Sequence, residues 1–338
     1  MSNMLHIVNG DSALALIKQT PIQGTFLIWK DMLMEGPVRE GTDGELDWKA
    51  RGAFLKNRFG IDAKAYLSGI KTFFAALERA AQGGEEVTFW FEEDFFCQIH
   101  LIYLLAHLPA PLLRKGRAFV ICPDKPLGIR MPGSMERLYN TRTPLEPARV
   151  TLARKVWKAF ALATSDGWES LLHWAQSGDG FAAWPLLQRG LRCHLGRRPA
   201  PDGGLNPLEA AMLRALVGGT VNFPQFFRRT WNEPQVRPLG LGDIQIARYA
   251  LDFASQRFPL LEIAGPGSSP KPGEPIVTKD WKLRLTADGR ALFSPMKNPA
   301  SKDKPKAAAK PKAIAKVKKS GSKPAVPSKK AKAPSPKK

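Results

Sequence analysis

Short apolar runs alternate with helical patterns along the first third of the chain. Buried-strand patterns recur four times, over residues 5–11, 25–31, 86–94 and 117–123. Apolar residues at helical spacing fill the intervals between these runs. Alternation of this kind requires right-handed crossovers, which place helices on both faces of a mainly parallel sheet. The pattern therefore predicts an α/β fold with a Rossmann-like, three-layer domain over residues 1–140.

The apolar pattern changes twice after this domain. Residues 146–200 keep the helical period and show no strand pattern, which predicts a helical connector. Residues 201–295 predict three helices, the third beginning near Asp243, and then a β-hairpin over residues 282–294. Three helices followed by a hairpin is the order of a winged helix, so we expect a winged-helix-like C-terminal domain.

The charge distribution adds a basic tail to this layout. Lys and Arg number 51 against 30 Asp and Glu, which gives a formal charge of +21. Residues 297–338 hold fifteen lysines and one aspartate, with no aromatic residue. A segment built of Lys, Ala, Pro and Ser cannot bury enough apolar surface to fold alone. We therefore expect residues 296–338 to be disordered.

Several sequence features restrict the class of protein. No apolar run reaches the roughly 18 residues that a membrane span requires, and the N-terminal residues do not match a secretion signal. The three cysteines, Cys97, Cys122 and Cys193, are widely spaced, which is typical neither of a disulfide framework nor of a Cys-based zinc site. We expect a cytoplasmic protein with no membrane partner.

Four carboxylates follow the predicted strands of the α/β domain, namely Asp11, Asp31, Glu92 and Asp94. The carboxyl ends of parallel strands meet at one edge of a sheet, where ligands bind, so we expect these four on one rim. Neighbouring carboxylates can hold Mg²⁺ or act as general bases, which makes the four candidate catalytic residues without assigning a metal. The candidate ligand-binding residues around them are Asn9, Ser12, Trp29, Glu35, Arg51, Trp90 and Gln98.

Aromatic and basic side chains can complete such a site. Trp29, Trp48 and Trp90 can floor a pocket for a planar base, and Arg39 or Arg51 can neutralise an anion. The chain has no phosphate-binding P-loop and no full GxGxxG motif. It also lacks the GxSxG and SxxK motifs of covalent hydrolases. These absences disfavour covalent hydrolase chemistry.

The same carboxylates also have a structural interpretation. Asp11 and Ser12 can cap the first helix, and Asp94 can cap the helix that begins at Phe95. Asp31, together with Glu35, can organise the loop that follows the second strand. Carboxylates used by helix caps would favour a binding protein. Carboxylates within about 5 Å of one another, open to a pocket and not bonded to helix N–H groups would favour an enzyme.

Three segments of the α/β domain, LHIVNGDSA, WKDMLMEGPV and FWFEEDFFCQIHL, and GLNPLE near the C-terminal end resemble the bacterial family called domain of unknown function 1835. The resemblance covers residues 4–295 and leaves out the Lys-rich tail. It implies the same pairing of an α/β domain with a C-terminal region, and Glu93 departs from it because a His is common at that position. The family has no assigned activity. Its polar motif positions fall on Asn9, Asp11, Ser12, Trp29, Asp31, Glu35, Pro37, Trp90, Glu92, Asp94 and Gln98.

Nucleic acid is the partner that the charge favours. The Lys-rich tail can neutralise several phosphates, which gives salt-sensitive affinity without sequence preference. The third C-terminal helix should expose Gln245, Tyr249, Asp252 and Gln256, a face without a basic residue that disfavours base reading. The candidate nucleic-acid contacts are Arg228, Arg229, Lys282, Arg284, Lys318, Lys319, Lys329 and Lys330.

Two hypotheses from different classes follow. The first is a cytoplasmic bacterial protein that associates with nucleic acid non-specifically through its tail and binds an unidentified small molecule or nucleotide in its α/β domain. The alternative is a metal-assisted hydrolase or transferase that acts on a nucleotide-like substrate at the carboxylate rim, with Mg²⁺ as its candidate cofactor.

Overall fold

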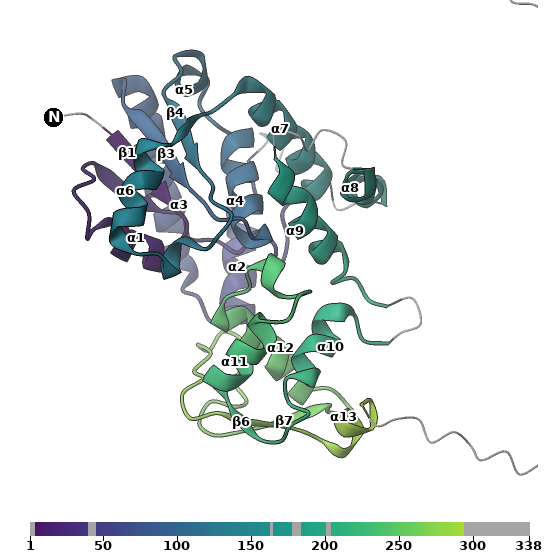
Figure 1. Ribbon diagram of the computed structural model, residues 1–338. Helices are drawn as coiled ribbons and strands as arrows, with labels where there is room; N and C mark the ends of the chain where they lie inside the picture. Colours follow the sequence, from purple (N-terminus) through teal and green to yellow (C-terminus); the bar gives the residue numbers. More distant parts are fainter. Residues whose placement is uncertain (1–3, 40–44, 163–164, 178–183, 201–203, 294–338) are drawn as a thin grey trace, which may run out of the picture. The chain divides into compact units, whose positions relative to one another are not determined.

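The computed structural model describes residues 4–39, 45–162, 165–177, 184–200 and 204–293 (Figure 1). The predicted basic tail, with Lys318, Lys319, Lys329 and Lys330, lies outside the described residues. Among the helices of the described residues, none has both the length and the apolar character that a bilayer crossing requires.

A five-stranded sheet forms the centre of the α/β domain. Its strands lie in the order β2-β1-β3-β4-β5. The first four pair in parallel and β5 pairs antiparallel with β4. Their bounds are β1 Met4–Val8, β2 Thr25–Ile28, β3 Glu86–Trp90, β4 Ala118–Ile121 and β5 Thr143–Pro144. The prediction of an α/β fold with a mainly parallel sheet is confirmed, and β5 is an addition that the sequence pattern did not predict.

Helices cover both faces of this sheet (Figure 1). Successive residues of a strand accordingly belong to two different hydrophobic cores. Leu5, Ile7 and Phe89 belong to the large core, together with residues of α3 and α4. Val8 and Trp90 belong to a smaller core with residues of α1 and α6. The helices of the domain are α1 Asp11–Ile17, α2 Trp48–Phe59, α3 Ala63–Gly83, α4 Phe95–Ala106, α5 Ala110–Arg114, η1 Leu127–Ile129 and α6 Pro132–Asn140.

The predicted connector is helical and packs on the α/β domain. Its helices are α7 Pro147–Ala161, α8 Ser165–Ser177 and α9 Pro185–Leu195. A proline stands in the first turn of α7 and of α9, where the missing N–H costs no helical hydrogen bond. Both α7 and α9 contact α4, so the connector adds a layer of helices over the large core.

The C-terminal region, residues 204–293, combines short helices with a small sheet. Its three strands are antiparallel in the order β6-β8-β7. Two of its helices begin with a reciprocal capping box, formed at Asn206 and at Asn222. The elements are α10 Pro207–Arg214, β6 Val221–Asn222, α11 Phe223–Trp231, η3 Arg237–Leu239, α12 Asp243–Ala254, β7 Leu261–Ala264, β8 Lys282–Leu285 and α13 Ala287–Ala291.

The predicted hairpin over residues 282–294 is wrong in its second half. Lys282–Leu285 is a strand, but its hairpin partner is β7, which precedes it in the chain. The stretch read as a turn is a helix start, because the Thr286 side chain accepts a hydrogen bond from the Gly289 N–H at 3.0 Å and caps α13. A Thr-x-x-Gly sequence fits a turn and a helix cap equally well.

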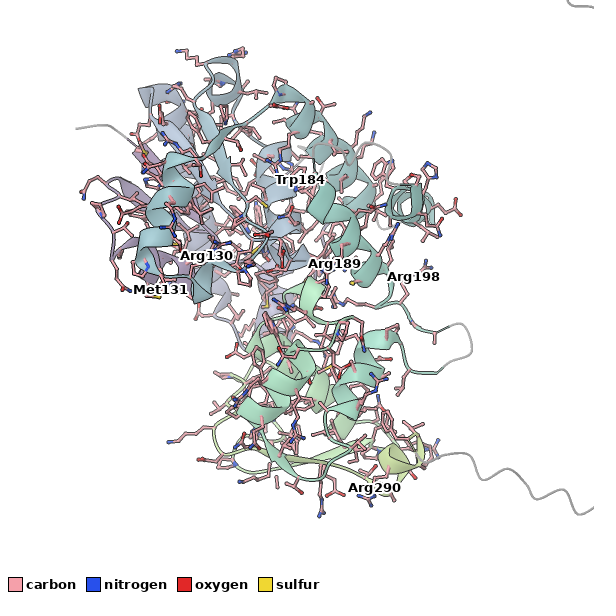
Figure 2. The ribbon with its side chains drawn as sticks, in the orientation of Figure 1. Arg130, Met131, Trp184, Arg189, Arg198 and Arg290 are labelled. Carbon is pink, nitrogen blue, oxygen red and sulfur yellow. The ribbon has the colours of Figure 1, made fainter. Side chains whose placement is uncertain are left out.

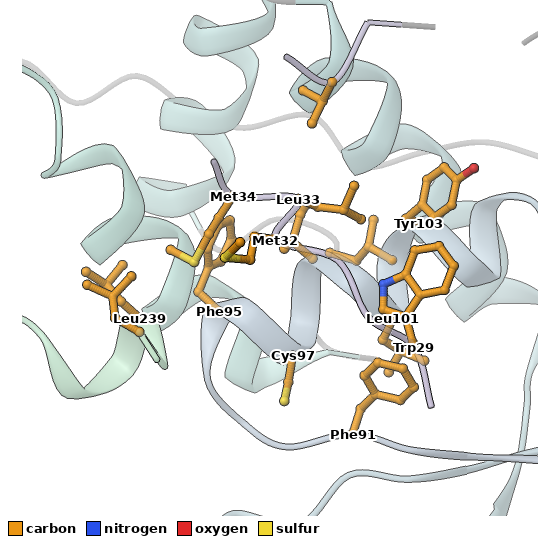
Figure 3. Packing of buried hydrophobic residues seen from close by; sticks show 14 of the residues in the cluster. Trp29, Met32, Leu33, Met34, Phe91, Phe95, Cys97, Leu101, Tyr103 and Leu239 are labelled. Carbon is orange, nitrogen blue, oxygen red and sulfur yellow. The ribbon is translucent and has the colours of Figure 1, made fainter. Parts of the chain in front are cut away.

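The exposed face predicted for α12 is wrong for three of its four residues. Gln245 is 1% exposed and donates to Glu35 Oε1 at 3.0 Å. The Tyr249 hydroxyl and the Asp252 carboxylate accept hydrogen bonds from Arg197 and Arg58, at 2.5 and 2.8 Å. A helix face whose polar side chains form hydrogen bonds with other elements has the same sequence pattern as a helix face exposed to solvent. The η3 turn also reaches the α/β domain, where Leu239 lies beside Phe95 (Figure 3).

Candidate functional site

The strand order places a topological switch point between β1 and β3. From β1 the chain proceeds to β2 on one side, and β3 then pairs on the other side of β1. The loops that leave β1 and β3 therefore diverge, and ligands of open α/β sheets bind in the crevice between such loops. Four residues that the sequence places after these strands lie here, and we call them the switch-point cluster: Asn9, Glu92, Asp94 and Cys97.

Hydrogen bonds join the members of the switch-point cluster. Asn9 Nδ2 donates to Cys97 Sγ at 2.7 Å, which ties the β1 loop to α4. Asp94 is the N-cap of α4 and accepts from the Cys97 N–H at 2.8 Å. Glu92 Oε1 accepts from the Leu127 N–H at 2.9 Å, at the start of η1. The ligand atoms of Glu92, Asp94 and Cys97 lie within 4.8 Å of one another.

Burial controls the protonation of this cluster. It raises the pKa of Asp94 to about 7, with the Cys97 N–H opposing the rise and the charge of Glu92 adding to it. Burial also raises the pKa of Glu92, against the hydrogen bonds from the backbone of Leu127 and Gly128. It raises the pKa of the Cys97 thiol well above its usual value. Cys97 is therefore a neutral thiol at physiological pH and a poor nucleophile.

The switch-point cluster fits a metal ion poorly. Mg²⁺ prefers six oxygen ligands in near-octahedral geometry, whereas one of the three available groups here is a protonated thiol. Each of the two carboxylates also accepts a hydrogen bond from a backbone N–H. The arrangement matches helix capping better than it matches metal binding.

A cavity of about 250 Å³ opens beside Asp94, and we call it the junction pocket. The loops after β3 and β4 provide Glu93, Asp94, Asp124 and Lys125. The helix α9 provides Arg189, which Figure 2 labels, and Gly190. The η3 turn provides Arg237 and Pro238. The chain can pack closely here because residue 240, directly after η3, is a glycine. The φ of Gly240 is +68°, and a Cβ at this position would lie 2.2 Å from the Asp94 carboxyl carbon.

The junction pocket carries both signs of charge. Arg189 and Arg237 are exposed, and in the described part of the chain neither guanidinium has a carboxylate within 4.0 Å. Burial raises the pKa of Glu93, and the nearby charges of Arg189, Arg237 and Arg130 lower it. Asp124 was not among the sequence candidates, although it lies in the loop that follows β4 and the strand-end rule that selected Asp94 also selects it. The arginines carried no local signal.

Asp31 lies away from this pocket in a buried network. The side chains of Asp31 and Arg51 are 0% and 1% exposed and form an ion pair. Arg51 Nε and the Tyr66 hydroxyl donate to Asp31 Oδ2 at 3.2 and 2.8 Å, and the Met32 N–H donates to Oδ1 at 2.5 Å. Arg51 Nη1 also donates to the carbonyls of Glu35 and Pro37. Asp31 and Arg51 therefore fix the 31–37 loop and are not free to meet a ligand.

Glu35 joins three parts of the chain. Its carboxylate accepts from Arg197 Nη2 at 2.5 Å and from Gln245 Nε2 at 3.0 Å. Arg197 Nη1 also donates to the Met34 carbonyl at 3.1 Å. This residue therefore holds the end of α9 and the start of α12 against the 31–37 loop.

The remaining candidates of the rim have separate surroundings. Asp11 is exposed in the first turn of α1 and forms an ion pair with Lys30 at 3.4 Å, and Ser12 is exposed beside it. Trp90 is fully buried, and its indole N–H donates to His6 Nδ1 at 3.2 Å. Gln98 is buried and donates to the Glu92 carbonyl and to Cys122 Sγ. The structure therefore brings together Asn9, Glu92 and Asp94 but not all four carboxylates.

Trp29 lines a second cavity, and Asp31 and Tyr66 are also among the lining residues of that cavity. Trp29 packs against Phe73 in the large core, and the cavity is apolar, has a volume of about 450 Å³ and lies between the end of β2 and the helices α2 and α3. Trp48 packs against the other side of Trp29 with ring centroids 6.3 Å apart. The three tryptophans therefore do not floor a common pocket, and Arg39 is exposed at another cavity.

Four of the candidate nucleic-acid contacts lie in the described residues, and two of these four already form hydrogen bonds or ion pairs within the chain. Arg228 and Lys282 are exposed on α11 and β8. Arg229 donates to the Ala215 carbonyl at 3.1 Å. Arg284 forms an ion pair with Glu262 at 2.6 Å. These four residues supply less free positive charge than the count of basic residues indicates.

No protein-family model matches the chain, and the search of curated proteins found no matching relative. The resemblance to domain of unknown function 1835 therefore stays a prediction, and the function is argued from the site.

Proposed function

We propose that this chain is a binding protein, with a small-ligand site at the junction pocket and a Lys-rich segment that binds nucleic acid without sequence preference. The observation that carries the proposal is the engagement of three of the four candidate catalytic carboxylates. Asp31 is paired with Arg51, and Asp94 and Glu92 accept from backbone N–H groups. Groups consumed in this way position loops and helices rather than substrates.

The junction pocket favours a small ligand of mixed charge. Its volume of about 250 Å³ is below the range of roughly 300–1,000 Å³ typical of drug-sized ligands, so a nucleotide exceeds it. Arg189 and Arg237 suit a carboxylate, and Glu93 and Asp124 suit an ammonium group. An amino-acid-like zwitterion has this chemistry.

A thermal-shift panel tests the ligand site. The panel consists of glutamate, arginine and glycine, and of AMP and ATP with and without Mg²⁺. A ligand that binds only the folded state raises the unfolding temperature. We expect an amino acid to stabilise wild type and Arg228→Gln equally and Arg237→Gln much less, because both substitutions remove one exposed charge but only Arg237 lines the pocket. No response to any amino acid would refute the ligand class.

The nucleic-acid part of the proposal rests on the tail and not on the C-terminal region. That region has the element order of a winged helix, α10-β6-α11-α12-β7-β8, which supports a winged-helix-like fold. The helix that would enter the major groove is α12, and its polar face contacts Glu35, Arg58 and Arg197. Domain packing therefore accounts for α12, and fold alone does not imply function.

Deletion of residues 297–338 tests the tail. The deletion removes fifteen lysines, so affinity for duplex DNA should fall steeply and the log–log dependence on salt should flatten. Replacing Arg228, Arg229, Lys282 and Arg284 by Gln in the full chain should cost less, because fewer counterions are released. Titrations at two salt concentrations measure both slopes. Full affinity after the deletion would show that the folded residues carry the nucleic-acid site.

The alternative, a metal-assisted hydrolase or transferase, rests on the proximity of Glu92 and Asp94. It predicts calorimetric binding of Mg²⁺ that Asp94→Asn abolishes, and a thermal shift with a nucleotide only in the presence of Mg²⁺. The binding hypothesis predicts neither. The proposal also includes a Rossmann-like class for the α/β domain, which the switch point supports. It further includes membership of the domain 1835 family and a cytoplasmic location.

A further inference from the structure

A small cavity of about 190 Å³ lies at the edge of the main sheet, beside the end of β4. Ile121 and Cys122 form part of its wall, together with Thr141 and Thr143. Two arginines, Arg142 and Arg149, are among its lining residues, and no acidic residue is. None of the sequence candidates lies in this cavity.

Arg149 has no hydrogen-bonded counter-ion. Its Nε is buried without a hydrogen-bond partner, and in the described part of the chain its side chain forms no ion pair. The guanidinium stacks on Trp184, which precedes α9, at 4.9 Å from the ring centroid. This stacking fixes the direction of the guanidinium plane. Burial lowers the pKa of Arg149, and the charges of Cys122 and Glu146 offset that effect only in part.

Three other largely buried arginines of the chain are each paired. Arg51 pairs with Asp31, Arg197 pairs with Glu35, and Arg142 pairs with Glu86 at 3.1 Å. A charge removed from water without a partner is costly, so buried charges are normally paired. Half-buried Arg117 has no ion pair among the described residues either, but its guanidinium donates to the carbonyls of Glu85 and Ala81. In the described part of the chain the Arg149 side chain has neither kind of partner, and Arg149 lies at the wall of a cavity.

We infer that Arg149 and this cavity form a binding site for a small oxyanion, either a phosphate group or a carboxylate group. The guanidinium fork matches both anions by two parallel N–H bonds. Arg149 lies in the first turn of α7. The cavity holds about six water-sized groups at roughly 30 Å³ each, which suits a phosphate or a short carboxylic acid. This site is separate from the junction pocket.

A matched pair of variants in the full-length protein tests the inference. Arg149→Gln and Lys155→Gln each remove one positive charge from α7, but Lys155 is exposed and does not line the cavity. The unfolding temperature is measured with inorganic phosphate, with acetate and with sodium chloride at equal ionic strength. The Lys-rich tail is the same in all samples, so its contribution cancels.

We expect phosphate or acetate to raise the unfolding temperature of wild type and of Lys155→Gln by several degrees above the sodium chloride sample. The same anion should give Arg149→Gln no more than the sodium chloride response. The more effective of the two anions identifies the ligand group. An equal response of all three proteins would overturn the inference, and so would the lack of any response beyond that to sodium chloride.

A second measurement separates an anion site from a stacking role. Without added anion, Arg149→Gln should unfold at the wild-type temperature or above it, since an unpaired buried charge has been removed. A clear drop would show that Arg149 stabilises the fold through Trp184 and would overturn the inference. Arg149→Lys keeps the charge but loses the fork, so it should retain a weaker anion response.

Discussion

Replacing Asp31 by Asn removes one charge from a buried network without changing its outline. The Asp31 and Arg51 side chains are 0% and 1% exposed, so the guanidinium loses its counter-ion where water does not reach. Removing one partner of a buried pair costs about 3–5 kcal/mol, because the other charge is left uncompensated. The new amide can still accept from the Tyr66 hydroxyl. We therefore expect the lower end of the range, about 3 kcal/mol.

Urea unfolding followed by tryptophan fluorescence measures this loss as a lower midpoint at an unchanged slope. Asp11→Asn is the matched control, since this carboxylate is exposed and pairs with Lys30 at 3.4 Å. Its unfolding free energy should change by less than about 1 kcal/mol. The double variant Asp31→Asn with Arg51→Met should lose less than the sum of the single losses, because it leaves no unpaired charge.

Two results would refute this reasoning. If Asp31→Asn were as stable as Asp11→Asn, the pair would not hold the 31–37 loop. If Asp31→Asn instead kept its stability and abolished a ligand response, Asp31 would belong to a binding site and not only to the support of the 31–37 loop.

Further predictions concern the junction. The pKa of Asp94 is about 7 in the folded state and about 3.9 in the unfolded state. The stability that the protonated carboxyl contributes is therefore complete below about pH 4 and is lost as the pH rises through 7. Asp94→Asn keeps the helix cap but does not titrate, so the free energy of unfolding of this variant should decline less over the same pH range. Gly240→Ala should cost at least about 1 kcal/mol in urea unfolding, because φ is +68° and the new Cβ would meet Asp94. Glu35→Gln should destabilise more than Asp252→Asn, since the Glu35–Arg197 pair is 14% and 11% exposed and the Asp252–Arg58 pair 32% and 37%; equal losses would contradict this ranking.

The elements that local sequence patterns specify were predicted best. The run of apolar and aromatic residues over 86–94 contains β3, and Asp94 is the helix cap that its position before Phe95 allowed. The strand β5 has only two residues, both exposed, and one is Pro144, which suits an edge strand. Such a segment has no periodicity, so the sequence alone did not predict it.

The candidate site was predicted only in part, because the sequence shows where a strand ends but not where the side chains that follow it point. The strand-end rule selects residues after β1 and β3, and Asn9, Glu92 and Asp94 do gather there. It cannot tell that Asp31 is paired with Arg51, because the direction of a side chain after a strand depends on tertiary packing. The arginines of the junction pocket stand about 100 and 140 residues beyond Asp94, and no local pattern links them to it.

The position of α12 decides how the folded part can meet nucleic acid. For α12 to enter a major groove, Gln245 would have to leave Glu35, and Asp252 would have to leave Arg58. The first of these contacts is largely buried, so its loss would leave Glu35 with Arg197 as its remaining partner and would expose part of the core. In return the helix would offer DNA the acid Asp252, and phosphates repel acids. Contact through α12 would therefore cost both a buried contact and charge complementarity, so we expect the proposed nucleic-acid binding to depend on the fifteen lysines beyond residue 296.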